Sequence, residues 1–376
     1  MTRAGSILKK ILLLFLAAFL ALLLCEIILE HLAERSHSLP ERTKSYYSWS
    51  FYTYSGIRLS ASKGLLKLRL SPGVVYENAP SQKTPFFSIN SSGYRGPEIS
   101  PLRPGQKRII VVGGSTAFGT GLNSDGETFA VHLEKLLPGT QVINAAVIGY
   151  ESGNELALVA RSLINLNPNL IIALDGFNDF AEFHNPDWDP HVAGFNCFGV
   201  FDLAANQIAF TWEPLGVRLE KIPHIIFPQL INFSLNMENR ASLPLNAIRS
   251  GNTLLATSDV FAGNVSKMAI LSRGSGIAFL DILQPIAPLK PKSKSGLSGN
   301  YANFRSEVKR SLLRKDVPLL DINAHMRSFR VQDFMDVVHL DGHGNYLMAH
   351  LAAEYIRTHN LLVKRPVPSR NCRRQL

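Results

Sequence analysis

Residues 108–121 read RIIVVGGSTAFGTG, a continuous apolar run that ends in a glycine-rich turn. An unbroken run of this kind is typical of a strand buried on both faces of a parallel sheet. Similar runs follow along the chain, separated by segments with helical spacing, and they occupy residues 141–147, 169–175, 276–282 and 318–322. Their alternation predicts an α/β fold, a three-layer α/β/α sandwich with a mostly parallel, doubly wound sheet.

The glycine-rich turn does not match the common phosphate-binding motifs. Gly114 and Gly119 have the spacing of a P-loop, but the lysine that should follow them is absent. A dinucleotide-binding motif would need one more glycine, and the nucleophile-elbow motif fails at Ala117. What remains is Ser115 directly after two glycines, which by itself could be a turn or capping serine with no chemistry.

The ends of the other expected strands change this interpretation. In open parallel sheets ligands bind outside the carboxyl ends of the strands. Gly149 in AVIGY follows the second run, Asn178 in GFND follows the third, and DVVH near the C-terminus contains Asp336 and His339. A serine nucleophile needs a base, a carboxylate that orients the base, and donors for an oxyanion. Together with Ser115, these residues meet all of these needs.

The same four blocks resemble those of the SGNH hydrolases, the GDSL-type esterases and lipases, over about residues 107–358. The resemblance implies that Ser115 is the nucleophile, His339 the general base and acid, and Asp336 the partner that orients the histidine. It implies an SGNH, flavodoxin-like fold and ester hydrolysis. The first block reads GGST where many members have Gly-Asp-Ser.

The resemblance also implies three oxyanion donors: the backbone amides of Ser115 and Gly149 and the side chain of Asn178. The segment INSSGYRGPE, residues 89–98, is similar to the segment that precedes the catalytic block in exported bacterial members. The chain therefore resembles a membrane-anchored bacterial SGNH hydrolase.

Neighbouring polar residues have other interpretations. His343 and Asp341 lie close to His339, as in a metal site, but the HExxH motif fails at Leu340 and no third ligand is evident. We therefore expect no metal and no cofactor. Asp333 is a second candidate for the carboxylate that orients His339, at a less favourable separation.

The first thirty residues indicate a membrane anchor. Three cations, Arg3, Lys9 and Lys10, precede the apolar run at residues 11–29, which as a helix would span roughly 28 Å, about one hydrocarbon core. A cleaved signal peptide is the competing interpretation, but no small-residue cleavage site follows the run. The positive end predicts a cytoplasmic N-terminus in the bacterial inner membrane, with the rest of the chain periplasmic or extracellular.

Composition divides the chain into four parts. Residues 1–35 form the cytoplasmic end and anchor, and residues 36–106, rich in Gly, Pro, Ser and Asn, form a stalk and irregular lead-in. Residues 107–360 form the hydrolase domain, with an insertion at about 183–266, and residues 361–376 form a basic tail.

The formal charge of +10 is spread along the chain, and the tail has no interleaved aromatics, so we expect no nucleic-acid partner. The three cysteines, at positions 25, 197 and 372, form no CxxC pair, and a bridge between Cys197 and Cys372 is left open.

Family and compartment together suggest hydrolysis of O-acyl esters, such as acetyl esters, on envelope or extracellular carbohydrate through an acyl-serine intermediate. An O-acyltransferase with the same acyl-serine is an alternative, as is a non-catalytic, anchored binding or assembly protein. The sequence does not address the oligomeric state.

Overall fold

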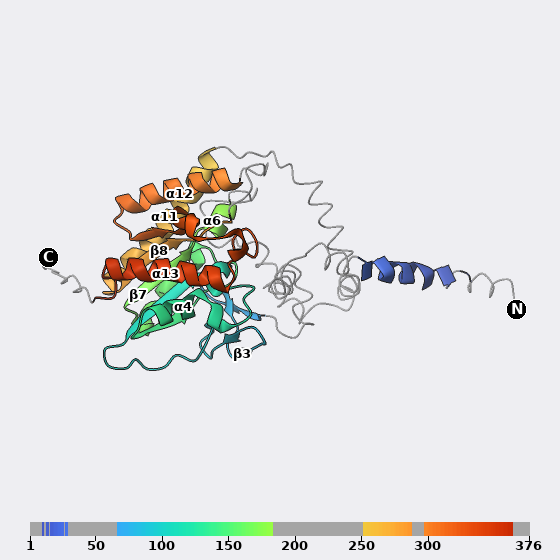
Figure 1. Cartoon of the computed structure of the whole chain (residues 1–376), viewed down its shortest axis with the longest axis horizontal. Helices are drawn as coiled ribbons and strands as arrows, with labels where there is room; N and C mark the ends of the chain where they lie inside the picture. The colour runs from blue at the N-terminus through green and yellow to red at the C-terminus, as the bar shows by residue number, and fades with distance from the viewer. Residues whose placement is uncertain are drawn as a thin grey trace.

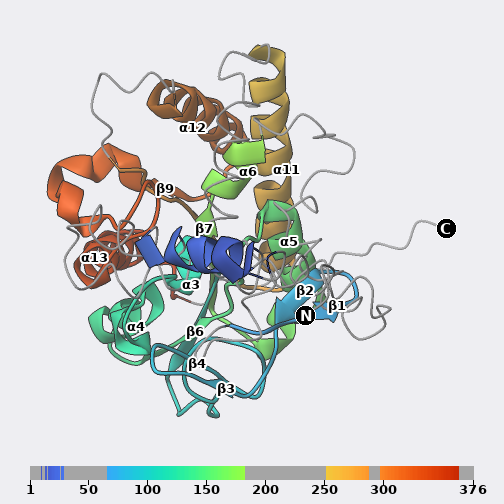
Figure 2. The same ribbon diagram turned by 90° about the vertical axis from the view of Figure 1, so that its right-hand side faces the viewer.

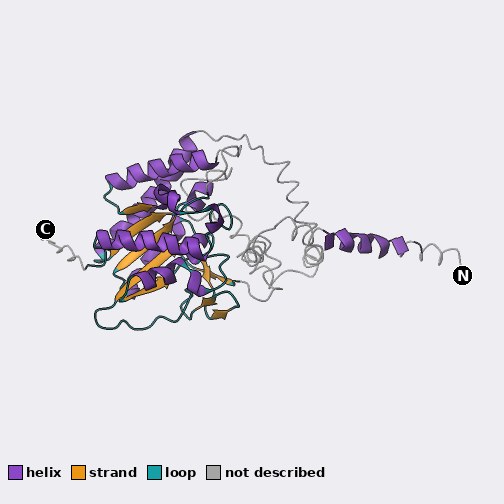
Figure 3. Ribbon diagram, in the orientation of Figure 1, coloured by secondary structure: helices purple, strands orange, loops and turns teal. Residues whose placement is uncertain are grey.

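The computed structural model describes residues 10, 13–14, 16–25, 27–28, 66–182, 251–287 and 297–363. Its centre is a five-stranded parallel sheet with helices on both faces (Figures 1 and 3). The strands are β5 (Lys107–Gly113), β6 (Thr140–Asn144), β7 (Leu170–Asp175), β8 (Ala278–Leu283) and β9 (Leu319–Asp321). The predicted α/β fold with a parallel sheet is confirmed, and each of the five apolar runs overlaps one strand.

The strand order is β6-β5-β7-β8-β9. The chain therefore leaves β5 on one side to form β6 and then returns across β5 to form β7 on the other side. The carboxyl ends of strands on either side of such a reversal border a crevice, which is where ligands bind in open α/β sheets. Ser115 follows β5 and Asn178 follows β7, so the topology places both at this crevice.

Two apolar cores lie on the two faces of the sheet, and β5 contributes to both. Ile109 and Val111 face the layer that contains α4 (Phe129–Leu136) and α13 (Gly342–Thr358). Ile110 and Val112 face the layer of α5 (Ser152–Arg161), α11 (Gly251–Gly274) and α12 (Leu297–Arg314). Figure 2 shows these two layers on opposite sides of the strands. Burial on both faces explains why the strands read as continuous apolar runs rather than alternating ones.

Short elements connect these layers. They are the helices α3 (Ser115–Phe118) and α6 (Phe177–Glu182) and the 3₁₀ turns η2 (Asp125–Glu127), η3 (Leu163–Leu166), η4 (Ile322–Ser328) and η5 (Val331–Asp333). The lead-in was expected to be irregular, but its described part forms two antiparallel pairs. These join β1 (Leu68–Ser71) to β2 (Val75–Asn78) and β3 (Gln82–Lys83) to β4 (Ser88–Ile89).

The described residues of the expected anchor are helical, and their large apolar side chains are exposed: Leu13, Leu14, Leu16, Phe19, Leu20, Leu22, Leu24, Ile27 and Ile28. No helix in the described part of the chain combines the length and apolar character needed to cross a bilayer. The transmembrane anchor therefore stays a prediction. Residues 36–65, most of the expected insertion, Cys197, Cys372 and the end of the basic tail lie outside the described residues.

Three carboxyl groups lie in the core near the carboxyl ends of the central strands. Asp175 ends β7, Asp281 lies on the adjacent β8, and Glu155 lies on α5; none of the three is more than 3% exposed. Within the described ranges no donor reaches their carboxyl oxygens, but the side chain of Asp175 interacts with those of Glu155 and Asp281. Buried carboxyl groups with no donor in reach favour the neutral form, so we expect this cluster to retain protons in the folded protein.

Burial, and then repulsion from Asp175, raises the pKa of both Glu155 and Asp281 well above the usual range. Burial also raises the pKa of Asp175 to about 7. The folded protein therefore binds these protons more tightly than the unfolded chain does. The resulting stabilisation is complete below the unfolded pKa of about 4 and is lost as the pH rises through the folded pKa values.

We expect Asp281→Asn to flatten the decline in stability between pH 5 and pH 8, because asparagine keeps the shape of the carboxyl group and cannot lose a proton. The free energy of unfolding would be measured by denaturant titration at several pH values. Its decline with rising pH should be less steep in the variant, by the contribution of up to about one bound proton per molecule. Asp316→Asn is the matched control, since the Asp316 side chain is fully exposed, at 104%. Equal slopes for Asp281→Asn and the unchanged protein would contradict the raised pKa of Asp281.

Candidate active site

Ser115 is the first residue of α3, a single helical turn that follows the carboxyl end of β5. The amide of Phe118 bonds to the carbonyl of Gly114 at 2.9 Å, and the amide of Gly119 bonds to the carbonyl of Ser115 at 3.0 Å. Amides in the first turn of a helix have no partner within the helix and point outward from its N-terminus. The backbone N–H and the hydroxyl of Ser115 therefore both face the crevice above the sheet.

His339 connects Ser115 to Asp336. Its Nε2 lies 2.8 Å from Ser115 Oγ, and its Nδ1 lies 2.8 Å from Asp336 Oδ2. A carboxylate can only accept, so Nδ1 carries the proton, and Nε2 of the neutral ring can accept the hydroxyl proton of the serine. Because the His339 side chain is only 14% exposed, water has little room to compete for these bonds.

Asp336 is held in its ionised form. Its Oδ1 accepts from the amides of Val338 at 2.8 Å and His339 at 2.7 Å, so the backbone itself fixes the carboxylate. Burial acts to raise the pKa of Asp336, but the electrostatic interaction with His339 and these hydrogen bonds outweigh burial, so the pKa lies below its usual value. The loop closes through a 2.8 Å bond from the amide of Met335 to the carbonyl of His339.

Asp333, the other candidate for the orienting carboxylate, faces a different set of partners. It binds Arg330 Nη2 at 2.9 Å and His343 Nδ1 at 3.0 Å, away from His339. His343 is therefore engaged by Asp333 and Arg330 rather than by His339. Among the described residues, no group of three or more His, Cys, Asp or Glu side chains is arranged to hold a metal ion.

The predicted oxyanion donors lie on neighbouring turns. Asn178 lies in α6 just beyond β7, and its Nδ2 donates to the carbonyl of Tyr150 at 2.8 Å. The second N–H of that amide group can donate to a substrate oxygen. Gly149 directly precedes Tyr150 in the turn after β6, with φ at 80°, a conformation that favours glycine. The Tyr150 carbonyl thus joins the Asn178 side chain to the Gly149 turn.

Gly114 makes this arrangement possible. A Cβ atom at Gly114 would lie 2.5 Å from Asn178 Nδ2 and 3.1 Å from the carbonyl oxygen of Tyr150. Because Gly114 has no side chain, the serine turn can lie directly against the side chain of Asn178. The structure brings the five predicted site residues to one edge of the sheet, and their individual roles stay predictions.

The lead-in supports the Gly149 turn, which the sequence did not predict. The Tyr76 hydroxyl donates to the carbonyl of Ile148 at 3.0 Å, and Asn78 Nδ2 donates to the carbonyl of Ala146 at 3.2 Å. In return, the hydroxyl of Tyr150 donates to the carbonyl of Tyr76 at 2.5 Å. These contacts join positions about seventy residues apart, and no local motif marks them.

A second unpredicted bridge links the serine turn to the histidine loop. Gln284 Nε2 donates to Thr116 Oγ1 at 3.1 Å, and Thr116 Oγ1 donates to the carbonyl of Val338 at 3.4 Å. Gln284 directly follows β8, and a buried polar residue at a strand end is the signal that could have identified it.

Asp179, next to Asn178, braces α6 against α5. Its carboxylate accepts from the amide of Ser152 at 3.0 Å and from the Ser152 hydroxyl at 2.5 Å, which ties the start of α6 to the start of α5. Burial raises the pKa of Asp179 to about 6.

Comparison with known proteins gives only distant likenesses. No family model matches the chain, and no curated protein matches it. The solved structures to which it is similar include a GDSL-like lipase from Bacteroides thetaiotaomicron, 14% identical with a TM-score of 0.41, over 69% of this chain and 93% of the lipase. An acetylxylan esterase from Geobacillus stearothermophilus is 11% identical with a TM-score of 0.39, over 70% and 97% of the two chains. A lipase/acylhydrolase from Enterococcus faecalis is 12% identical with a TM-score of 0.40, over 68% and 97%.

We expect Gly114→Ala to displace the amide of Asn178, because the added methyl group would overlap its Nδ2 atom. The rate at which a fluorophosphonate labels Ser115 should fall by about 10²-fold, as for the loss of one oxyanion donor. Gly263→Ala is the matched control, since a Cβ at that α11 position meets no atom within 4 Å. A Gly114→Ala variant labelled as fast as the control would argue against this geometry.

Proposed function

We propose that the protein is a serine ester hydrolase of the SGNH type that acts through an acyl-serine intermediate. The observation that carries this proposal is the unbroken hydrogen-bonded chain from Ser115 Oγ through His339 to Asp336, with both links at 2.8 Å. The same arrangement of hydroxyl, imidazole and carboxylate performs acyl transfer on unrelated folds. The geometry therefore supports this chemistry independently of the fold.

The reaction begins when Ser115 Oγ attacks the ester carbonyl and its proton passes to His339 Nε2. The imidazolium that forms is stabilised by the ionised Asp336. The carbonyl oxygen becomes an oxyanion, which accepts from the amides of Ser115 and Gly149 and from Asn178 Nδ2. Collapse of the tetrahedral intermediate breaks the ester bond, and His339 gives its proton to the departing alcohol oxygen.

The acyl group is then released by water. His339 Nε2 accepts a proton from the water as its oxygen attacks the acyl-serine carbonyl, and the same donors stabilise the second oxyanion. Collapse returns the proton from His339 to Ser115 Oγ and frees the carboxylic acid. The enzyme needs no other reactant.

For the substrate we propose an O-acyl ester of carbohydrate, with acetyl as the acyl group. A cavity of about 270 Å³ borders the histidine loop, and its lining includes Asn123, Glu127, Asp341 and His343 together with Met335. Carboxylate, amide and imidazole groups suit the hydroxyl groups of a sugar better than a long hydrocarbon chain.

For the location we propose a single membrane anchor at residues 11–29, with a cytoplasmic N-terminus and an active site on the periplasmic or extracellular side. The apolar run has about the length of a bilayer core, and the described part of its helix exposes its large apolar side chains. Three cations precede the run.

We expect the full-length protein to hydrolyse p-nitrophenyl acetate and Ser115→Ala to lose about 10⁴-fold or more of kcat, because no other hydroxyl replaces the nucleophile. Asp336→Asn should also lose about 10⁴-fold, since the wrong ring tautomer of His339 is then favoured. Both would be measured by release of nitrophenol.

Asp333→Asn is the matched control, a change of the same size on the same loop that leaves the bonds of His339 intact. Turnover by Ser115→Ala equal to that of the unchanged protein would end the hydrolase assignment. Acetate release from an acetylated oligosaccharide, set against acetyl transfer to an added sugar, would separate hydrolase from transferase.

A further inference from the structure

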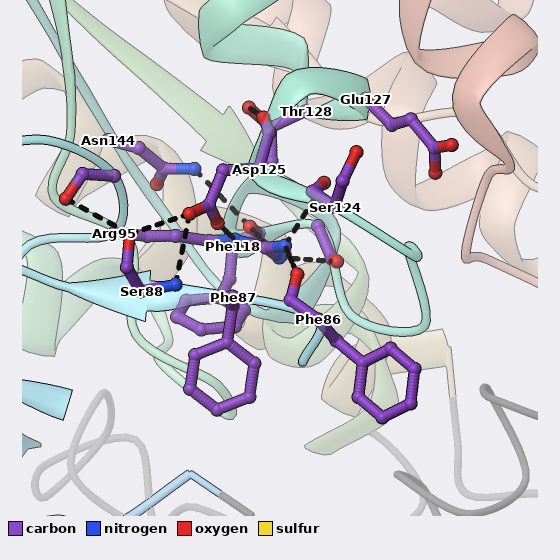
Figure 4. A network of polar contacts seen from close by, with 12 residues as sticks. Phe86, Phe87, Ser88, Arg95, Phe118, Ser124, Asp125, Glu127, Thr128 and Asn144 are labelled. Atoms are coloured by element: carbon purple, nitrogen blue, oxygen red, sulfur yellow. Dashed lines mark hydrogen bonds and ion pairs between the residues drawn. The ribbon is translucent and has the colours of Figure 1, made fainter. Parts of the chain in front are cut away.

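Arg95, in the lead-in, reaches the end of α3 opposite Ser115. Its side chain is only 1% exposed, and Figure 4 shows it pointing inward between Phe118, Ser124 and Asp125. The guanidinium carbon also lies 4.9 Å from the centre of the Phe118 ring, within the range of a cation–π contact. The residue belongs to none of the catalytic blocks.

The guanidinium group has five N–H bonds, and five acceptors surround it. Nη1 contacts the carbonyls of Phe118 at 3.0 Å and Gly119 at 2.7 Å, and Nε contacts Asp125 Oδ1 at 2.8 Å. Nη2 contacts the carbonyls of Phe86 at 3.3 Å and Ser124 at 3.4 Å. One side chain thus joins the lead-in, the last residues of α3 and the loop after them.

The turn that carries Ser115 depends on such partners because it is so short. A helix of four residues cannot sustain itself, and its last carbonyls have no partner within the helix. Arg95 supplies donors to two of these carbonyls, and Asn144 Nδ2 supplies another to the carbonyl of Ala117 at 3.0 Å. A cation is also the favoured charge at a helix C-terminus.

The fit of Arg95 to the turn is close. A Cβ atom at Gly119 would lie 3.1 Å from Arg95 Nη1, and Gly119 has φ at 88°, which favours glycine. Asp125 is fixed in turn, because its Oδ2 accepts from both the amide and the hydroxyl of Ser88, at 2.9 and 2.6 Å. The guanidinium is therefore held in one orientation.

We infer that Arg95 is a positioning residue for the nucleophile: it fixes the α3 turn so that Ser115 Oγ and the Ser115 amide keep their places relative to His339 and Asn178. The inference rests on the proposed hydrolase function. Arg95 touches no reacting atom, so its loss should alter the rate of the chemical step and leave substrate affinity nearly unchanged.

The test compares Arg95→Lys with Arg305→Lys in the full-length protein. Arg305 is a suitable control because it also pairs with an aspartate, Asp321, at 2.5 Å, and lies on the other face of the sheet from α3. Lysine keeps the charge but has three donors in place of five. For p-nitrophenyl acetate we expect kcat of Arg95→Lys to fall about ten- to a hundredfold, with KM and the apparent pKa of the rate profile unchanged.

Chemical rescue provides a second measurement. Millimolar guanidinium should restore part of kcat in Arg95→Ala and have no such effect in Ser115→Ala. Equal kcat losses in Arg95→Lys and Arg305→Lys, or a rise in KM that accounts for the whole effect, would overturn the inference. If Arg95→Ala fails to fold, the comparison of kcat between Arg95→Lys and Arg305→Lys still tests the inference.

Hydrogen exchange separates this inference from the hydrolase proposal, since it needs no activity. The amides of Phe118, Gly119 and Thr120 bond within the turn, at 2.9 to 3.0 Å. In Arg95→Lys these amides should exchange at least about tenfold faster than in Arg305→Lys, while the amides of β7 exchange equally in both. Unchanged exchange at the turn would overturn the inference even if the unchanged protein proved inactive on every ester.

Discussion

The site depends on the close approach of the turn after β5 to the end of β7. A Cβ atom at Gly113 would lie 2.3 Å from the carbonyl oxygen of Leu174, and one at Gly114 would lie 2.5 Å from Asn178 Nδ2. Two successive glycines are therefore a steric requirement rather than a flexible linker. They let the nucleophile turn lie directly against β7 and against the Asn178 side chain in α6, which follows β7.

The second constraint is that the three parts of the site come from separate segments, each braced by a buried polar contact. Thr116 and Gln284 connect the serine turn to the histidine loop, and Asp179 with Ser152 connects α6 to α5. Buried polar groups of this kind favour one arrangement, because any alternative leaves a donor or acceptor unpaired. The position of the triad is therefore set by the surrounding network as much as by the loops that carry it.

The sheet and the site residues were predictable because their signals are local. Strands buried on both faces read as apolar runs, and the parallel topology alone brings the residues after β5 and β7 to one crevice. The supporting residues were not predictable, since the partners of Tyr76, Asn78 and Arg95 are distant in sequence and none has a distinctive spacing. The two short antiparallel pairs of the lead-in were also not indicated, because its Gly-, Pro- and Ser-rich composition shows no strand period. The anchor, the insertion and the domain boundaries stay predictions.

The lead-in has a further consequence for how the protein can be divided. The proposed chemistry lies entirely within residues 107–360, yet the groups that hold the Gly149 turn and the α3 turn lie upstream, at Tyr76, Asn78 and Arg95. The upstream segment therefore supports two of the turns that form the active site. A fragment cut at the start of β5 would keep every reacting group and lose these supports, so a useful truncation has to keep β1 and β2.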